Sequence, residues 1–159
     1  MKKWLIIVEG IILGIFALSS FAFAQHSHGH GTGSSAMKME TREVLADGVK
    51  VTFQIMSNEE HKKMLKDMKM KEDLEAGTTH NLTVTLKDQK TQKEITDAQV
   101  TMKVVDPKGK DQIKEMKYEG EMKSFDAYFA LPDKGKYQVM VLVKKGDQKI
   151  PAGIYYEVK

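Results

Sequence analysis

The chain of 159 residues contains no cysteine, and this absence removes several kinds of site at once. Without thiols the protein forms no disulfide, no thiolate zinc site, no cysteine nucleophile and no lipidated N-terminal cysteine. Arginine is almost as scarce, because Arg42 is the single arginine among 25 cationic residues and the formal net charge is only +3. Nucleic-acid binders usually carry a concentrated basic surface. We therefore expect no nucleic-acid partner.

Motifs of catalysis are scarce as well. The chain has no glycine-rich loop of the kind that cradles phosphates. Ser57 and Ser124 lie in no recognisable nucleophile context. We therefore expect a protein without enzymatic activity. Methionine, by contrast, is frequent, with eleven in the whole chain.

Residues 1–24 have the pattern of a secretory signal peptide. Lys2 and Lys3 give a positive start, residues 11–23 are almost wholly apolar, and Ala22-Phe23-Ala24 fits the small-x-small cleavage pattern. This predicts cleavage before Gln25 and a periplasmic or secreted protein with no membrane attachment after cleavage. The alternative is a leader that is kept as an anchor, although the apolar run is short for a spanning helix.

Residues 25–38 are predicted to form a flexible arm that contains three alternating histidines. Most of the arm, from Gln25 to Ser35, has no hydrophobic side chain that could support a fold of its own. His26, His28 and His30 form a tract typical of metal capture. Imidazole suits Cu(II), Ni(II) and Zn(II) alike, so the tract favours a divalent ion without selecting one. A solvated linker is the alternative interpretation.

The rest of the chain, 39–159, is dominated by alternation of apolar and polar residues. This pattern with turns at short intervals predicts an all-β, immunoglobulin-like antiparallel sandwich of two sheets with seven or eight strands. The turn pair Asp47-Gly48 predicts a hairpin at its start. The expected strands cover residues 42–46, 49–55, 80–86, 100–104, 125–131, 137–143 and 154–158, with a weaker signal over 113–118.

One segment, at about residues 57–70, has helical periodicity. Ser57 and Glu60 form a capping-box signature. The following side chains at positions i, i+3, i+4 and i+7 predict a helix with one buried face. They are His61, Met64, Leu65 and Met68.

Soft metal ligands are concentrated in the first half of the chain. All five histidines lie at or before position 80, and six methionines lie between 37 and 70. Thioether sulfur prefers Cu(I), and imidazole accepts either oxidation state of copper. His61, Met64 and Met68, with Met70 just beyond, therefore form a first candidate site. The alternative is that these methionines fill irregular gaps in a core.

His80 is the second candidate ligand. Alternation directs His80 inward with Leu82 and Val84, at the first position of its strand. Met68 and Met70 immediately precede this strand, so we predict a Cu(I) pocket in which they fold over His80. The alternative is a core histidine whose ring nitrogen bonds a carbonyl.

The segment 77–159 resembles the small exported YtkA-like and copper-resistance-C-like immunoglobulin-type domains. The resemblance rests on the strand 80–86, on Asp97-Ala98-Gln99-Val100, and on the strand 125–131 that runs through Pro132-Asp133-Lys134-Gly135 into Tyr137. It implies a periplasmic protein linked with copper or other heavy metals. In copper-resistance-C-like proteins the metal is held by an N-terminal histidine and by methionine-rich segments. Here the methionine cluster precedes the resembling segment.

Together these observations predict an exported, non-enzymatic metal-binding protein, with copper as the favoured ion. The arm would capture Cu(II) or another divalent ion, and the pocket of Met and His side chains would hold Cu(I). A metal-efflux or metal-accepting envelope protein would then be the partner. The alternative hypothesis is a metal-free immunoglobulin-like interaction or accessory module of the cell envelope.

Overall fold

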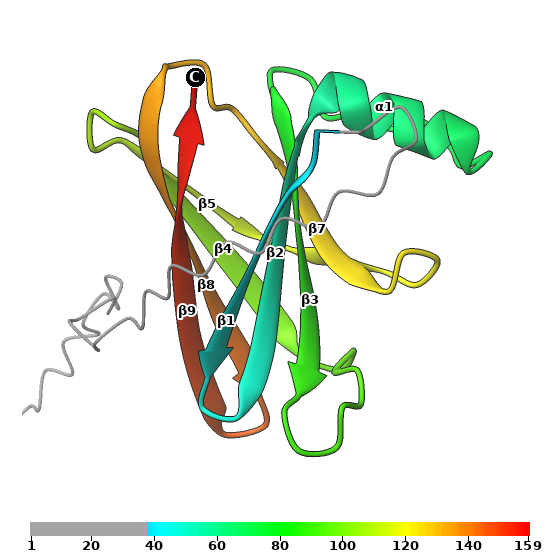
Figure 1. Ribbon diagram of the computed structural model, residues 1–159, viewed down its shortest axis with the longest axis vertical. Coiled ribbons are helices and arrows are strands. Elements are labelled where there is room, and N and C mark those ends of the chain that lie inside the picture. Colours follow the sequence, from blue (N-terminus) through cyan, green and yellow to red (C-terminus); the bar gives the residue numbers. More distant parts are fainter. Residues whose placement is uncertain (1–37) are drawn as a thin grey trace, which may run out of the picture.

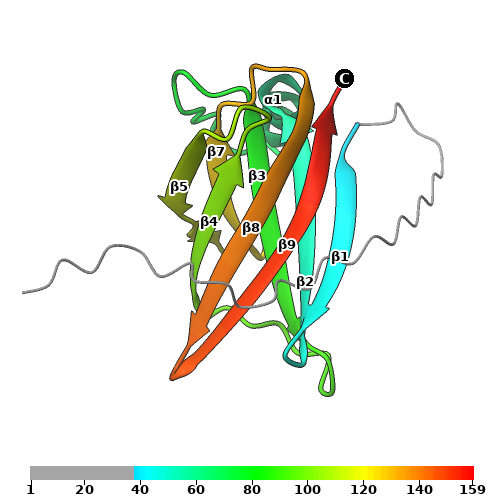
Figure 2. The same cartoon turned by 90° about the vertical axis from the view of Figure 1, so that its left-hand side faces the viewer.

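The computed structural model describes residues 38–159 and consists of two antiparallel sheets packed face to face (Figure 1). The first sheet has the order β1 (Glu40–Ala46), β2 (Val49–Ser57), β3 (His80–Asp88), β7 (Ser124–Phe129) and β6 (Lys117–Glu119). The second has the order β5 (Asp111–Glu115), β4 (Gln99–Val105), β8 (Gly135–Lys145) and β9 (Gln148–Val158). Figure 2 shows β8 and β9 in front of β2 and β3. The expected all-β, immunoglobulin-like sandwich is confirmed.

The predicted leader and His26, His28 and His30 lie outside the described residues. Among residues 38–159, no helix is both long enough and apolar enough to cross a membrane.

The first hairpin forms as the turn pair predicts. Asp47 and Gly48 both have positive φ, 47° and 77°, which is the backbone of a two-residue hairpin turn. The turn sets the register in which Val44 lies opposite Val51. Both valines are buried. The hairpin therefore directs its apolar side chains toward the second sheet.

The described residues contain nine strands, because the weak signal over 113–118 divides into two. β5 pairs with β4 in the second sheet, whereas β6 pairs with β7 in the first. Between them the buried Met116 donates its backbone N–H to the carbonyl of Val100 at 2.8 Å. The chain crosses from the second sheet to the first at Met116. The single apolar alternation over 113–118 therefore covers two short strands that belong to different sheets.

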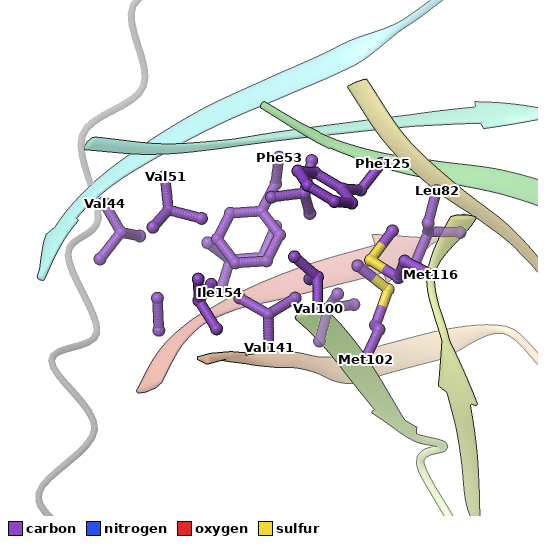
Figure 3. Close-up of a cluster of buried hydrophobic side chains, with 14 of the residues drawn as sticks. Val44, Val51, Phe53, Leu82, Val100, Met102, Met116, Phe125, Val141 and Ile154 are labelled. Atoms are coloured by element: carbon purple, nitrogen blue, oxygen red, sulfur yellow. The ribbon is translucent and has the colours of Figure 1, made fainter. Parts of the chain in front are cut away.

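The core lies between the sheets and comprises alternate side chains of nearly every strand. Figure 3 shows Phe53 of β2 close to Ile154 of β9, and the sulfur atoms of Met102 and Met116 side by side. Met102 is fully buried, as its strand register predicts. The core is a dry apolar layer, so a site that binds polar ligands has to lie at its ends or outside it.

Candidate metal centre

Helix α1 (Asn58–Asp67) begins at the end of β2 with the predicted capping box. The Ser57 hydroxyl accepts the N–H of Glu60 at 3.2 Å, and the Glu60 carboxylate accepts the N–H of Ser57 at 3.3 Å. The N–H of Asn58 donates to the carbonyl of Thr79 at 2.8 Å, next to the start of β3. The start of the helix is thus fixed to the end of β2 and to the residue before β3.

The end of α1 determines where Met70 lies. Lys69 has a φ of +57°, and this left-handed residue ends the helix after the C-cap Met68. The N–H of Met70 then donates to the carbonyl of Leu65 at 2.8 Å, and the N–H of Lys69 donates to Lys66 at 3.0 Å. This pair of bonds is a Schellman motif. It turns the chain back, so the backbone of Met70 is bonded to a buried position of the helix.

The helix packs on the outer face of the first sheet, against β2 and β3. Its buried side chains are His61, 2% exposed, and Leu65, 5% exposed. Alternation places Met56 and Asn81 on this outer face, opposite the core residues of the same strands. Both are nevertheless buried. α1 therefore encloses a second, smaller buried layer in which polar side chains are mixed with apolar ones.

His61 is the central polar group of this layer. Its Nδ1 lies 3.1 Å from the hydroxyl oxygen of Tyr128 on β7, with the ring centroids 5.5 Å apart. Burial lowers the pKa of His61, so its imidazole is neutral at pH 7. Burial also raises the pKa of Tyr128 to about 12, which keeps the hydroxyl protonated. The His61 Nε2 atom is buried and has no hydrogen-bond partner.

His61 lines a pocket of about 1020 Å³. One wall is α1 with the segment that follows it, and the opposite wall comes from β5, β6, the turn after β6, and β7. The lining residues include Met70 and Met122, together with Tyr128 and Asp126. Burial, with a smaller contribution from the charge of Glu119, raises the pKa of Asp126. The pocket is thus lined by one buried histidine and two methionines, among acidic and lysine residues.

Lys114 joins the two walls of this pocket. Its ammonium donates to the Glu75 carboxylate at 2.7 Å and to the carbonyl of Tyr128 at 2.6 Å. The first bond holds the segment after α1, and the second holds β7, which carries the hydrogen-bond partner of His61. The pocket is consequently bounded by elements that are fixed to one another.

The structure brings together two of the predicted ligands of the first candidate site. His61 and Met70 line the same pocket, whereas Met64 and Met68 are not part of its lining. Met64 is half-buried on α1, and Met68 is 49% exposed at the C-cap. Met122 was not among the predicted ligands, because it comes from a distant turn and belongs to no helical or strand pattern.

His80 lies on the inner face of the first sheet, at the start of β3. Its Nδ1 is 2.8 Å from the hydroxyl of Thr79, and its ring meets Tyr156 of β9 edge-on at 5.9 Å. Burial lowers the pKa of His80, and the charge of Glu60 opposes this shift. His80 does not line the pocket that contains Met70. Met70 therefore shares a pocket with His61.

Within residues 38–159, no group of three or more His, Asp or Glu side chains is arranged to hold a metal ion.

Several solved structures share this fold. The periplasmically expressed FetP of uropathogenic Escherichia coli is 11% identical with a TM-score of 0.52, covering 78% of this chain and 97% of FetP. A copper-bound FetP variant is 11% identical with a TM-score of 0.52, covering 77% and 97%. A DUF4426 family protein of Pseudomonas aeruginosa is 13% identical with a TM-score of 0.57, covering 74% and 94%. At these identities the similarity establishes the fold alone.

No family model and no curated protein sequence matches the chain.

Proposed function

We propose that this is an exported, non-enzymatic metal-binding protein that handles copper, and that the pocket of His61 and Met70 holds Cu(I). The observation that carries the proposal is the buried Nε2 of His61, which has no hydrogen-bond partner. A buried polar atom without a partner costs about 1–3 kcal/mol. Coordination of an ion by Nε2 would recover this cost, which gives the unpaired atom a physical purpose.

The donor chemistry of the pocket fits Cu(I). A neutral imidazole and thioethers are soft, uncharged ligands, which Cu(I) accepts better than hard cations do. In this proposal the Tyr128 hydroxyl, 3.1 Å from Nδ1, would orient the ligating histidine. With the imidazole proton on Nδ1, the hydroxyl would accept that N–H and the Nε2 lone pair would be free for a metal. The copper-bound FetP variant, which has the same fold, supports copper as the ion.

In this proposal the arm and the pocket have separate roles. His26, His28 and His30 would capture Cu(II) or another divalent ion in the periplasm, after the leader is removed. The pocket would hold Cu(I) through neutral ligands, which release an ion to a partner more readily than thiolates. The partner would be a metal-efflux or metal-accepting protein of the envelope.

A titration of two forms of the protein tests this division. The mature chain and a variant lacking residues 26–31 are titrated with Cu(I) against a chromogenic chelator, and with Cu(II) and Ni(II). We expect the deletion to abolish weak Cu(II) and Ni(II) binding and to leave one Cu(I) per chain. Cu(I) binding no tighter than that of free methionine peptides would contradict the proposal and favour a metal-free interaction module.

Replacement of Tyr128 with phenylalanine tests how His61 is oriented. Loss of the hydroxyl leaves His61 Nδ1 without its partner, and loss of such an outer contact typically costs about 10–100-fold in metal affinity. We expect a loss of Cu(I) affinity in this range. Tyr118→Phe is the matched control, because Tyr118 packs against Phe125 and does not line the pocket. Equal Cu(I) affinity of both variants and the wild type would exclude an orienting role for Tyr128.

A further inference from the structure

The methionines of residues 38–159 fall into groups with different surroundings. Four of them are buried, with exposed fractions between 0% and 8%: Met56, Met102, Met116 and Met140. Met102 and Met116 belong to the main core, where Figure 3 shows their sulfur atoms among apolar side chains. Met70 and Met122 belong to neither the buried set nor the core cluster, and both line the pocket of His61. Packing in buried surroundings, inside the main core or outside it, therefore explains the first group but not these two.

Met122 occupies an unusual place for an apolar side chain. It lies in the turn between β6 and β7, where Gly120, Glu121 and Lys123 are all exposed. Met122 is half-buried, and the adjacent Lys123 has a φ of +51°. A lysine rarely adopts this left-handed backbone. The turn thus keeps a conformation that is costly for its sequence while it places a thioether at the pocket.

The same combination occurs on the opposite wall. Met70 directly follows Lys69, another non-glycine residue with positive φ. At Lys69 this conformation belongs to the Schellman motif that ends α1. Backbone strain in a turn such as that of Lys123 is common at ligand-binding positions. Each of the two methionines of the pocket is therefore next to a left-handed lysine, one at the end of α1 and one in the β6–β7 turn.

From this arrangement we propose that Met122 supplies the second thioether of the copper site. His61 Nε2, Met70 Sδ and Met122 Sδ would bind one Cu(I), and the ion would link the segment after α1 to the β6–β7 turn. This inference rests on the proposed copper site and adds a ligand and a preference to it. One nitrogen and two sulfurs, all neutral, form a soft donor set that favours Cu(I) over Cu(II) and Zn(II).

The test compares the same substitution at two methionines. Met122→Leu removes the sulfur with little change of volume, so the urea midpoint of unfolding should stay close to that of the wild type. Cu(I) affinity should fall at least about tenfold, which corresponds to about 1.4 kcal/mol. Met68→Leu is the matched control, because Met68 is outside the pocket lining, and its Cu(I) affinity should equal that of the wild type.

Two further readouts identify how the sulfurs act. X-ray absorption of the Cu(I)-loaded protein should give two sulfur ligands per copper in the wild type and one in Met122→Leu. Met70→Leu and Met122→Leu should also be non-additive when combined, because both change one site. Zn(II) and Cu(II) binding at the pocket should remain much weaker than Cu(I) binding in each variant.

The outcomes separate this inference from the proposed function. If the wild type binds Cu(I) tightly through His61 but Met122→Leu binds equally well with an unchanged sulfur count, Met122 is not a ligand while the copper site stands. If the wild type itself has no tight Cu(I) binding, both proposals fail.

Discussion

Replacing His61 with alanine should weaken Cu(I) binding by at least about a hundredfold, a difference of about 2.7 kcal/mol. The change removes the imidazole of the histidine that lines the pocket with Met70 and Met122. Competition with a chromogenic Cu(I) chelator measures the effect. His61→Gln is a second variant for the same measurement, because it keeps a polar side chain of comparable length beneath α1 and limits the damage to packing.

The control for this prediction is His80→Ala. His80 is the other histidine among residues 38–159, and it lies on the inner face of the first sheet beside Tyr156. Its removal should leave Cu(I) affinity within about threefold of the wild type, or about 0.7 kcal/mol. If His80→Ala abolishes binding and both His61 variants retain it, the copper site belongs to the mouth of the sandwich, as alternation along β3 alone would favour.

Replacing Met102 with alanine should have the largest effect on stability among the methionines. The side chain is fully buried between the sheets, and truncation of such a residue costs about 2–5 kcal/mol through lost burial and the cavity that remains. Urea unfolding measures this loss as a lower midpoint. Cu(I) affinity measured under native conditions should be unchanged, because Met102 is not among the residues that line the pocket.

Met122→Ala provides the opposite result for comparison. Truncation of this half-buried turn residue should lower the free energy of unfolding by less than about 1 kcal/mol, as at surface positions. Cu(I) affinity should fall. The pair forms a crossed comparison in which one variant loses stability and the other loses metal. A large stability loss in Met122→Ala with unchanged Cu(I) affinity would assign Met122 to packing, and our division of the methionines would be incorrect.

The fold was largely predictable because the buried and exposed faces of a sheet appear in the sequence as alternating apolar and polar residues. Alternation along residues 80–86 and 137–143 distinguishes inward from outward side chains without knowledge of the partner strands. The two-residue turn at Asp47-Gly48 fixes the first hairpin locally. The division of residues 111–119 into β5 and β6 was not predictable. The alternation of apolar and polar residues continues unchanged where the chain crosses between sheets at Met116.

The candidate site was predictable only in those features that are determined by residues close together in the sequence. The capping box located the start of α1, and helical spacing identified His61 as a buried position. The periodicity gave no indication that α1 covers the outer face of the first sheet, because that choice depends on packing against β2 and β3. The Schellman turn was also hidden, since Lys69 occupies the position that glycine usually takes.

Met122 illustrates the limit more clearly. It reaches the pocket from a turn far along the chain, and only the pairing of β6 with β7 brings that turn to the segment after α1. A single methionine among exposed polar residues carries no periodic signal. The prediction for Met70 considered only His80, its neighbour in sequence, and so it did not include Met122.

The most direct measurement of the central claim is a methyl NMR titration of the mature protein, labelled at the methionine methyl carbons, with Cu(I) under anaerobic conditions. The account predicts that the Met70 and Met122 methyl resonances shift together and saturate at one equivalent, while those of Met102 and Met116 in the core stay in place. Assignment follows from the single Met→Leu variants. Saturation that shifts only Met64 and Met68, or no methyl at all, would contradict a copper site beneath α1.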